Sequence, residues 1–347
     1  MLFAACTRQE EPALAAGPQT EFVLGTVCSV NLYQFGSKER YSNVFALLRD
    51  LEYTLSATMP GTLLDTINQK SGLEPVSITS ELYSLLETSL WYAQRTEGAF
   101  DPAIGPLVKL WGIGTDKGRR PGPDEIAEKL LLTDYRKVRL ARSANDERSG
   151  SVFLEDTGMA LDLGAIAKGY AADVVADFLR QEGVEYALID LGGNILVLGS
   201  RPPSGNTDAR NAPWRIGIQD PLEQRGTFLG VMELSDKSLV TSGVYERFME
   251  HEDKRYHHIL SSRDGYPVKN GLIAVTVAAD RSTDADALST SLFALGYEKA
   301  LAFLESAELK AQAGQVYAVF VFADRRICLS RGTERLFQLR SSQYHLE

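Results

Sequence analysis

The sequence predicts an α+β fold in one compact unit. Helix-like segments alternate irregularly with short strand-like runs, whereas a doubly wound sheet requires regular alternation. The length of 347 residues suits one large domain or two ordinary ones, and the hydrophobic content of 44% is enough to bury a sizeable core. No shift in composition marks a boundary within residues 20–340. We therefore expect this range to form a single domain.

The first half of the chain predicts one strand and two helices. Residues 21–33 are strand-like, and residues 42–56 carry apolar side chains at the spacing of an amphipathic helix. The same spacing over 79–97 predicts a second helix, which stops at Gly98 because glycine takes the left-handed conformation after a helix end. The glycine-, proline- and charge-rich residues 113–124 predict a loop.

The second half mixes short strands with two further helices. A helix near 165–182 ends at Gly183, and another over 284–295 ends at Gly296. Residues 199–213 have the composition of a loop. Short apolar runs predict strands at 186–191, 195–198, 214–218, 239–241, 272–278 and 317–322.

Charge and cysteine content exclude several classes of protein. The 36 basic and 46 acidic residues give a net charge of −10, which argues against a nucleic-acid or anionic-membrane surface, since both need a cationic face. No apolar run reaches the roughly 18 residues that cross a bilayer. The three cysteines are too few and too scattered for a disulfide framework or a thiolate metal site. We interpret Cys28 and Cys328, which lie in apolar strand-like runs, as buried thiols.

Residues 1–19 resemble the end of a bacterial lipoprotein signal followed by a tether. Cys6 follows a short apolar run with small residues, and the residues after it are polar and rich in Ala, Pro and Gly. The basic part and most of the apolar part of such a signal are missing, so we expect the sequence to begin inside it. The alternative is an ordinary disordered N-terminus.

A turn containing Gly164 leads into the predicted helix that carries Lys168. Free N–H groups at a helix N-terminus and a nearby ammonium both favour a phosphate or pyrophosphate. The segment is neither a P-loop nor a Rossmann fingerprint. The alternative is a glycine turn with a solvated lysine.

Two further segments carry candidate chemistry. Asp286 and Thr290 are four residues apart on a predicted helix, so a carboxylate and a hydroxyl share a face that suits Mg²⁺; the alternative is that Thr283 caps this helix and Asp286 stabilises its first turn. His257 and His258 are neighbours in a strand-like run, so they point to opposite faces and one faces a cleft. A neutral histidine there accepts a proton near pH 7, although an adjacent pair is also found as structure alone.

Seven segments, in their order and spacing, resemble the ApbE family, the FAD:protein FMN transferases, over roughly residues 20–330. These are 24–26; 98–102 with 105–107 and 111–112; 162–170; 191–194; 241–243; 257–259 with 265–267; and 283–290. The resemblance implies the ApbE-type α+β fold, in which mixed sheets pack against helices. It implies FAD as the substrate, with Mg²⁺ at the FAD pyrophosphate.

The resemblance also implies roles for individual residues. The metal ligands are the side chains of Asp286 and Thr290 and the carbonyls of Ala165 and Ser289. His258 is the general base, or the residue that positions the acceptor hydroxyl. The implied FAD contacts are Leu24, Thr58, Ala99, Phe100, Asp101, Asp162, Lys168 and Leu260.

Two positions depart from the family pattern. Thr58 stands where a tyrosine is usual, and threonine cannot stack on an aromatic ring, a contact worth about 1–3 kcal/mol by analogy with base stacking. The turn at 261–265 also differs, which weakens the case for a detailed flavin contact at Leu260.

The implied activity transfers FMN from FAD to a Ser or Thr of a membrane-associated redox protein, through a phosphoester, and releases AMP. The family is often exported as lipoproteins, so we expect an extracytoplasmic protein that touches the membrane only through a lipid at Cys6. Three alternatives stay open. They are an FAD pyrophosphatase on the same scaffold, a flavin-binding lipoprotein without turnover, and an unrelated solute-binding lipoprotein.

Overall fold

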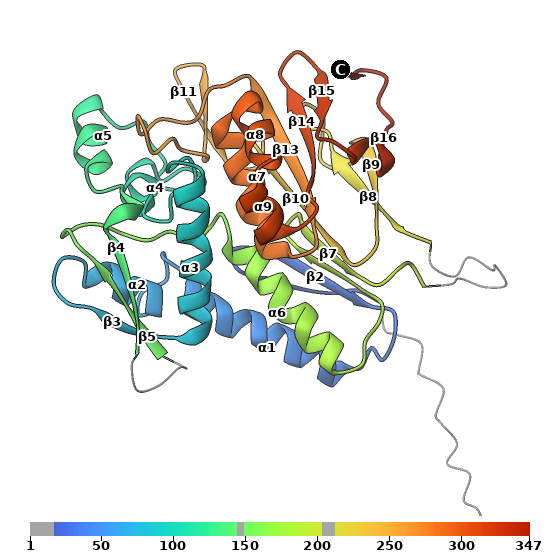
Figure 1. Ribbon diagram of the computed structural model, residues 1–347, viewed down its shortest axis with the longest axis horizontal. Helices are drawn as coiled ribbons and strands as arrows, with labels where there is room; N and C mark the ends of the chain where they lie inside the picture. The colour runs from blue at the N-terminus through green and yellow to red at the C-terminus, as the bar shows by residue number, and fades with distance from the viewer. Residues whose placement is uncertain (1–16, 144–148, 203–211) are drawn as a thin grey trace, which may run out of the picture.

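A nine-stranded sheet forms the centre of the protein (Figure 1), seen here in a computed structural model that describes residues 17–143, 149–202 and 212–347. Neighbouring strands are antiparallel, except that β17 runs parallel to β15. In spatial order the strands are β1 (Gln19–Val23), β2 (Thr26–Leu32), β6 (Ala187–Leu191), β7 (Asn194–Leu198), β10 (Lys237–Gly243), β13 (Leu272–Ala279), β14 (Tyr317–Phe322), β15 (Arg326–Leu329) and β17 (His345–Leu346).

Helices cover one face of this sheet and a small sheet covers the other. Every residue of β13 is buried, because Val275 and Val277 pack toward the helices while Ala274 and Ala278 pack toward the small sheet. The helices are α1 (Lys38–Leu55), α6 (Ala167–Gln181), α7 (Ser282–Leu295), α8 (Tyr297–Leu304) and α9 (Ala307–Ala313). The small sheet has the order β16 (Phe337–Leu339), β9 (Phe228–Leu234) and β8 (Trp214–Gln219).

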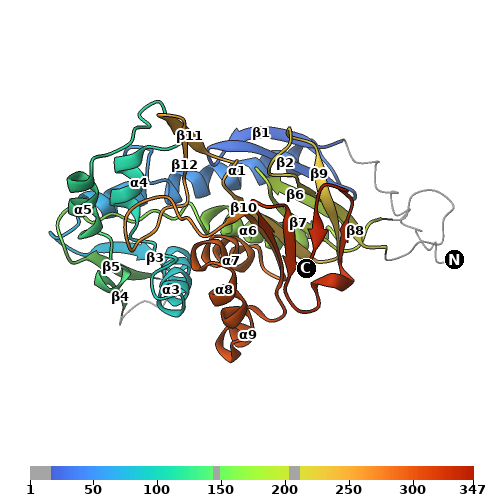
Figure 2. The ribbon, with the colours of Figure 1, turned by 90° about the horizontal axis from the view of Figure 1, so that it is seen from above.

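A second group of elements lies beside the main sheet, on the left of Figures 1 and 2. Its three-stranded sheet has the order β3 (Val76–Thr79), β5 (Ser149–Leu154) and β4 (Val138–Arg142). Its helices are α2 (Leu63–Gln69), α3 (Ser80–Arg95), α4 (Gly105–Trp111) and α5 (Pro123–Leu130), and the hairpin of β11 (Phe248–His251) and β12 (Lys254–His257) packs nearby. Short 3₁₀ turns occur at Tyr135–Lys137 and Thr333–Arg335.

The structure confirms the α+β fold, the four expected helices and the six expected strands of the second half, with small shifts at their ends. The helix expected at 42–56 begins at Lys38, because the Ser37 hydroxyl accepts a hydrogen bond from the Arg40 N–H at 3.1 Å and caps it. The strand expected at 21–33 is a hairpin that turns at Leu24 and Gly25, both with positive φ.

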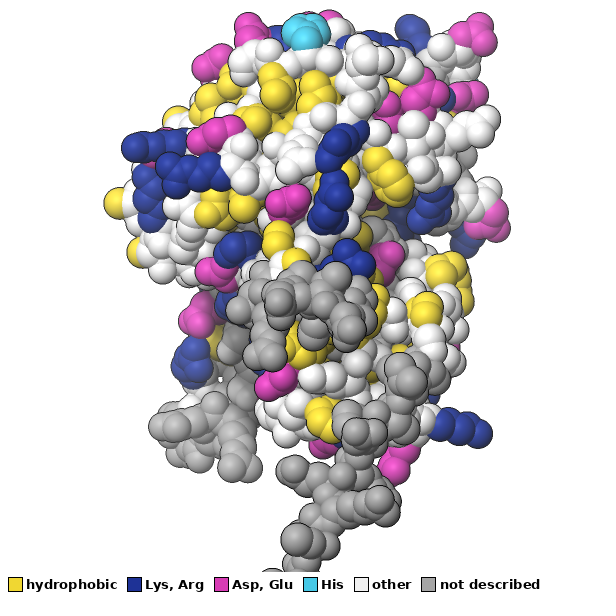
Figure 3. All heavy atoms as spheres, turned by 90° about the vertical axis from the view of Figure 1, so that its right-hand side faces the viewer, with side chains coloured by type: hydrophobic (Ala, Val, Ile, Leu, Met, Phe, Trp, Pro, Cys, Tyr) yellow, Lys and Arg dark blue, Asp and Glu magenta, His cyan; other side chains and the backbone are white. Residues whose placement is uncertain are grey.

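The other expectations concern the cysteines, membrane-spanning segments, surface charge and a loop. Cys28 and Cys328 are buried free thiols, as predicted. No helix among the described residues is long and apolar enough to cross a membrane. The face in Figure 3 intersperses basic with acidic side chains. Cys6 lies outside the described residues, as does most of the loop expected at 199–213.

Candidate active site

A cavity of about 690 Å³ opens between the main sheet and the second group of elements. Its volume is in the range of small-molecule and cofactor sites. Distant parts of the sequence line it: segments 99–101, 162–168, 192–194, 241–248 and 258–260, and Asp286 and Thr290 of α7. The structure therefore brings together six of the seven segments singled out from the sequence. Of the remaining segment, 24–26, only Thr26 reaches the cavity.

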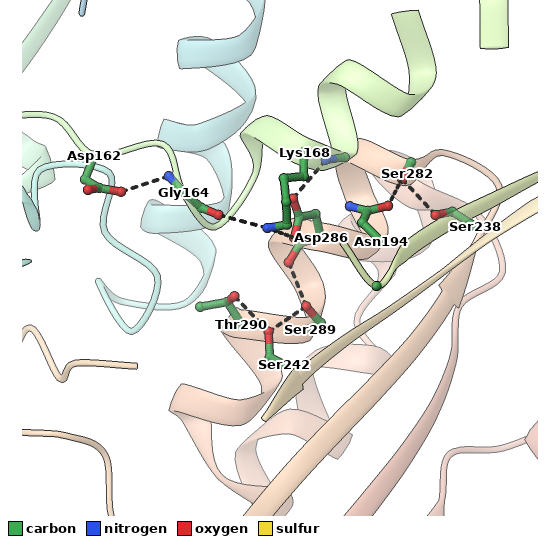
Figure 4. A network of polar contacts seen from close by, with 12 residues as sticks. Asp162, Gly164, Lys168, Asn194, Ser238, Ser242, Ser282, Asp286, Ser289 and Thr290 are labelled. Atoms are coloured by element: carbon green, nitrogen blue, oxygen red, sulfur yellow. Dashed lines mark hydrogen bonds and ion pairs between the residues drawn. The ribbon is translucent and has the colours of Figure 1, made fainter. Parts of the chain in front are cut away.

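The turn before α6 presents a lysine to the cavity, as predicted. The Asp162 side chain accepts a hydrogen bond from the Gly164 N–H at 2.8 Å, and this contact holds the turn. Burial raises the pKa of Asp162 above its ordinary value. Lys168 is the second residue of α6, and its Nζ lies 3.4 Å from the Gly164 carbonyl and 3.9 Å from Asp286 Oδ1 (Figure 4).

Asp286 is fixed where α6 crosses α7. Its Oδ2 accepts a hydrogen bond from the Gly169 N–H at 2.8 Å, and the residue is only 3% exposed. Glycine is required at position 169, since a Cβ there would lie 2.2 Å from the Ser282 carbonyl oxygen and 2.7 Å from Asp286 Cβ. The close crossing of the two helices thus places the carboxylate beside Lys168.

Hydroxyl groups surround the next turn of α7. Thr290 Oγ1 lies 3.1 Å from Ser242 Oγ, and the same Ser242 oxygen lies 2.8 Å from Ser289 Oγ. Thr290 lines the cavity together with Asp286 and Ala165, whereas Ser289 is fully buried behind them. These side chains and nearby carbonyls offer only hard oxygen donors, which fit Mg²⁺.

A cation here would have few protein ligands. Among the described residues no group of three or more His, Cys, Asp or Glu side chains is placed to hold a metal. Magnesium commonly binds through one or two carboxylates and completes its shell with substrate phosphates and water. The donor set around Asp286 therefore fits a cation that binds together with a phosphate ligand.

The alternative interpretation of this segment, in which Thr283 caps α7, is wrong. The helix begins at Ser282, and Arg281 occupies the capping position without a side-chain hydrogen bond. Asp173 of α6 takes that role instead, accepting hydrogen bonds from the Ser282 N–H at 2.8 Å and from the Thr283 N–H at 2.9 Å. A carboxylate on a neighbouring helix thus satisfies the first N–H groups, a contact that sequence spacing cannot reveal.

The two adjacent histidines face opposite ways, as expected. His257 is buried, with Nε2 at 2.9 Å from the Val268 carbonyl oxygen and the ring edge-on to Phe293. His258 lines the cavity, and its Nδ1 lies 3.1 Å from the Arg247 carbonyl oxygen.

The environment of His258 sets its charge and its tautomer. Burial, assisted by nearby cations, lowers the pKa of His258 to about 4, so the ring is neutral at pH 7. A carbonyl oxygen can only accept, so Nδ1 carries the proton and Nε2 keeps a lone pair. The ring therefore presents a proton acceptor.

The loop after α3 contributes Ala99, Phe100 and Asp101 to the cavity. Asp101 accepts hydrogen bonds from the backbone N–H groups of Ala103 at 2.8 Å and Tyr135 at 3.1 Å, and burial raises its pKa to about 7. Its oxygens thus already hold two backbone segments in place.

Of the three remaining residues predicted to contact FAD, one lines the cavity and two do not. Leu260 is buried and lines the cavity. Leu24 sits in the β1–β2 turn with φ of 56° and is not among the lining residues. Thr58 is exposed, with Oγ1 3.2 Å from Ser56 Oγ, and does not line the cavity either. The roles assigned to Leu24 and Thr58 stay predictions.

The sequence reasoning missed charged residues on the cavity wall. Arg225, Arg247 and Glu246 all line it, and within the described part of the chain neither arginine forms an ion pair. Glu246 is accessible to water inside the cavity yet surrounded by protein atoms, and this desolvation raises its pKa to about 7 despite nearby Lys168. Of this wall, only residues 241–243 had been singled out from the sequence.

Comparisons with known proteins give matches over most of the chain. A sequence model of the ApbE family matches residues 24–313. An FAD:protein FMN transferase of Treponema pallidum (strain Nichols) is 39% identical over 334 residues, covering 95% of this chain and 91% of the relative. One of Klebsiella pneumoniae (strain 342) is 39% identical over 305 residues, covering 88% and 89%.

Solved structures give the same result. The crystal structure of the ApbE protein of Thermotoga maritima superposes with a TM-score of 0.78 at 28% identity, covering 93% of this chain and 99% of that one. The flavin transferase ApbE from Vibrio cholerae superposes with a TM-score of 0.77 at 25% identity, covering 92% and 98%. The chain belongs to the ApbE family.

Proposed function

We propose that this protein is a Mg²⁺-dependent FAD:protein FMN transferase. The observation that carries the proposal is that Lys168, Asp286 and His258 all line one cavity. Relatives of this chain are named for the same reaction. A cation, a metal-binding carboxylate and a neutral base are the groups that transfer of a phosphoryl group to a hydroxyl requires.

FAD would occupy the cavity with its adenosine end at Ala99–Asp101 and its pyrophosphate between Lys168 and Asp286. The Lys168 ammonium offsets the negative charge of the pyrophosphate. The N–H groups at the N-terminus of α6 carry partial positive charge and act in the same direction. Mg²⁺ bound at Asp286 and Thr290, with the carbonyls of Ala165 and Ser289, would stabilise the charge that develops on the phosphates.

His258 performs the proton transfer. A Ser or Thr hydroxyl of the acceptor attacks the FMN phosphorus, and His258 Nε2 accepts the hydroxyl proton. A new phosphorus–oxygen bond forms while the bond to the bridging pyrophosphate oxygen breaks, so AMP departs with that oxygen. Lys168 offsets the charge that builds on the leaving phosphate.

A second candidate is an FAD pyrophosphatase, in which water replaces the protein hydroxyl. Thr58 favours this alternative, because it leaves the position without the aromatic ring usual in the family, and its side chain lies outside the cavity. The products would be free FMN and AMP.

The partner and location complete the proposal. The acceptor is a subunit of a membrane redox complex with a Ser or Thr in a short flavinylation motif. The enzyme acts outside the cytoplasm, attached to the membrane through a lipid at Cys6.

Two variants test the assignment by chromatographic measurement of AMP release from FAD. Asp286→Ala should abolish the Mg²⁺-dependent release while leaving the thermal unfolding transition cooperative. His258→Ala should lower turnover more than 100-fold and change the FAD dissociation constant little. Unchanged release in Asp286→Ala removes this residue from the metal site, and a collapse of FAD binding in His258→Ala overturns its role as a base.

A further inference from the structure

Asn194, the first residue of β7, holds a buried amide with an unpaired donor. The residue is 1% exposed, and its Nδ2 makes no hydrogen bond to any described residue. Buried amide donors are normally paired, since leaving one unpaired costs its hydration free energy. Asn194 also belongs to the wall of the cavity, so a partner that arrives with the ligands could satisfy it.

Ser282 and Ser238 lie on one side of this amide, and Ser238 Oγ also lies 2.9 Å from the Ile195 carbonyl oxygen. Asn194 Oδ1 accepts a hydrogen bond from Ser282 Oγ at 2.6 Å, and Ser282 Oγ lies 2.8 Å from Ser238 Oγ. Because Oδ1 is held by Ser282, Nδ2 is turned to the other side. Figure 4 shows that end of the amide directed toward the side of Lys168 and Asp286.

Helix geometry places the residue that contacts this amide on the same face of α7 as Asp286. Ser282 and Asp286 are four residues apart on α7 and so lie on the same face of the helix. Gly169 packs against both, because a Cβ at that position would lie within 2.7 Å of atoms of each. Asn194 therefore contacts the face of α7 that carries Asp286, and both residues line the cavity.

We propose that Asn194 is a positioning residue for the metal-binding carboxylate. When a divalent cation binds, Nδ2 of Asn194 and the Gly169 N–H together hold Asp286 Oδ2, and Oδ1 is left to coordinate the ion. The inference rests on the metal site of the proposed function. Hydrogen bonds from a second layer of residues commonly orient metal ligands, and their loss typically weakens metal binding 10- to 100-fold.

The test measures Mg²⁺ binding itself, with ADP at a fixed concentration in place of FAD, so that a pyrophosphate is present but no FMN can be transferred. The unfolding temperature of the full chain is recorded against MgCl₂ concentration, because a cation that binds only the folded state raises it by mass action. Asn194→Leu keeps the branching at Cγ but replaces the amide with two larger methyl groups and so removes the donor. Asn270→Leu is the matched control, because its Nδ2 donates to the Phe293 carbonyl and it does not line this cavity.

The expected result is an apparent Mg²⁺ affinity 10- to 100-fold weaker in Asn194→Leu, unchanged in Asn270→Leu and absent in Asp286→Ala. Wild-type affinity in Asn194→Leu overturns the inference but leaves the metal site intact. A wild-type protein that does not respond to Mg²⁺ overturns the metal site, and this inference with it.

Ser282→Ala provides the second variant if Asn194→Leu does not fold. It keeps the amide but removes the hydroxyl that orients it, so Mg²⁺ affinity should fall by a smaller factor. Unchanged affinity in Ser282→Ala would then count against the proposal.

Discussion

Replacing Gly169 by alanine should separate the two helices that carry Lys168 and Asp286. The added Cβ would lie 2.2 Å from the Ser282 carbonyl oxygen, and real Cβ atoms essentially never approach closer than 3.0 Å. The crossing of α6 and α7 must therefore open by at least 0.8 Å. The opening also stretches the 2.8 Å hydrogen bond from the Gly169 N–H to Asp286 Oδ2.

The expected cost follows from three terms. Overpacking costs about 1–3 kcal/mol, and weakening a hydrogen bond to a charged group costs about 1.5–3 kcal/mol. Alanine returns about 1 kcal/mol through its higher helix propensity. The net loss of about 3 kcal/mol corresponds to a fall of about 4 °C in unfolding temperature for a chain of 347 residues. A misplacement of about 1 Å should also lower Mg²⁺-dependent FAD cleavage about 100-fold.

Calorimetry and AMP release measure the two effects in the same preparation. Gly122→Ala is the matched control, since φ is −71° there and the nearest atom to an added Cβ is 3.6 Å away. If Gly169→Ala keeps the unfolding temperature and the activity of the control, the tight crossing does not hold Asp286, and the reasoning fails.

Three further predictions concern charge and the cavity wall. Because the pKa of His258 is lowered to about 4, we expect FAD turnover to persist from pH 7 to about pH 5 and to fall toward pH 4; a fall centred at 6.5, the ordinary histidine value, would contradict this. Because the pKa of Glu246 is raised to about 7, its negative charge appears above that pH, so FAD affinity measured without Mg²⁺ should decline there in the wild type. The decline should be smaller in Glu246→Gln, where of these two carboxyls only Asp101, whose pKa is also about 7, still titrates. An equal decline in both proteins would assign the effect to another group. Tyr344 donates a hydrogen bond at 2.6 Å to buried Asp220. Tyr344→Phe should therefore lower the free energy of unfolding by about 1.5–3 kcal/mol, measured by denaturant titration. An unchanged midpoint would show that this bond contributes little.

Local patterns predicted the elements that have strong periodicity or clear ends. Helix α3 has an apolar stripe, and α7 ends at a glycine; both features can be recognised without a structure. Strand β14 is a run of apolar residues. The hairpin at Leu24 was missed because a leucine at positive φ gives no turn signal of its own. The small sheet that covers the far face was missed in part because β9 has no distinct boundary in composition.

The candidate site was predictable where chemistry follows from residue type and order. The lysine at the start of α6, Asp286 with Thr290, and the divergence of His257 from His258 all follow from helix and strand geometry. Contacts between distant segments could not be read in this way. Asp173 caps α7 from another helix, and Arg225 reaches the cavity from a loop whose path only tertiary packing determines.

The central claim is that this protein attaches FMN to a hydroxyl of another protein in a reaction that requires Mg²⁺. The most direct test is a mass spectrum of an acceptor with a Ser or Thr flavinylation motif after incubation with the enzyme, FAD and MgCl₂. We predict a covalent gain equal to FMN that disappears when a chelator is added or Asp286→Ala is used. AMP and free FMN without an adduct would indicate the pyrophosphatase, and bound but intact FAD would contradict a catalytic role altogether.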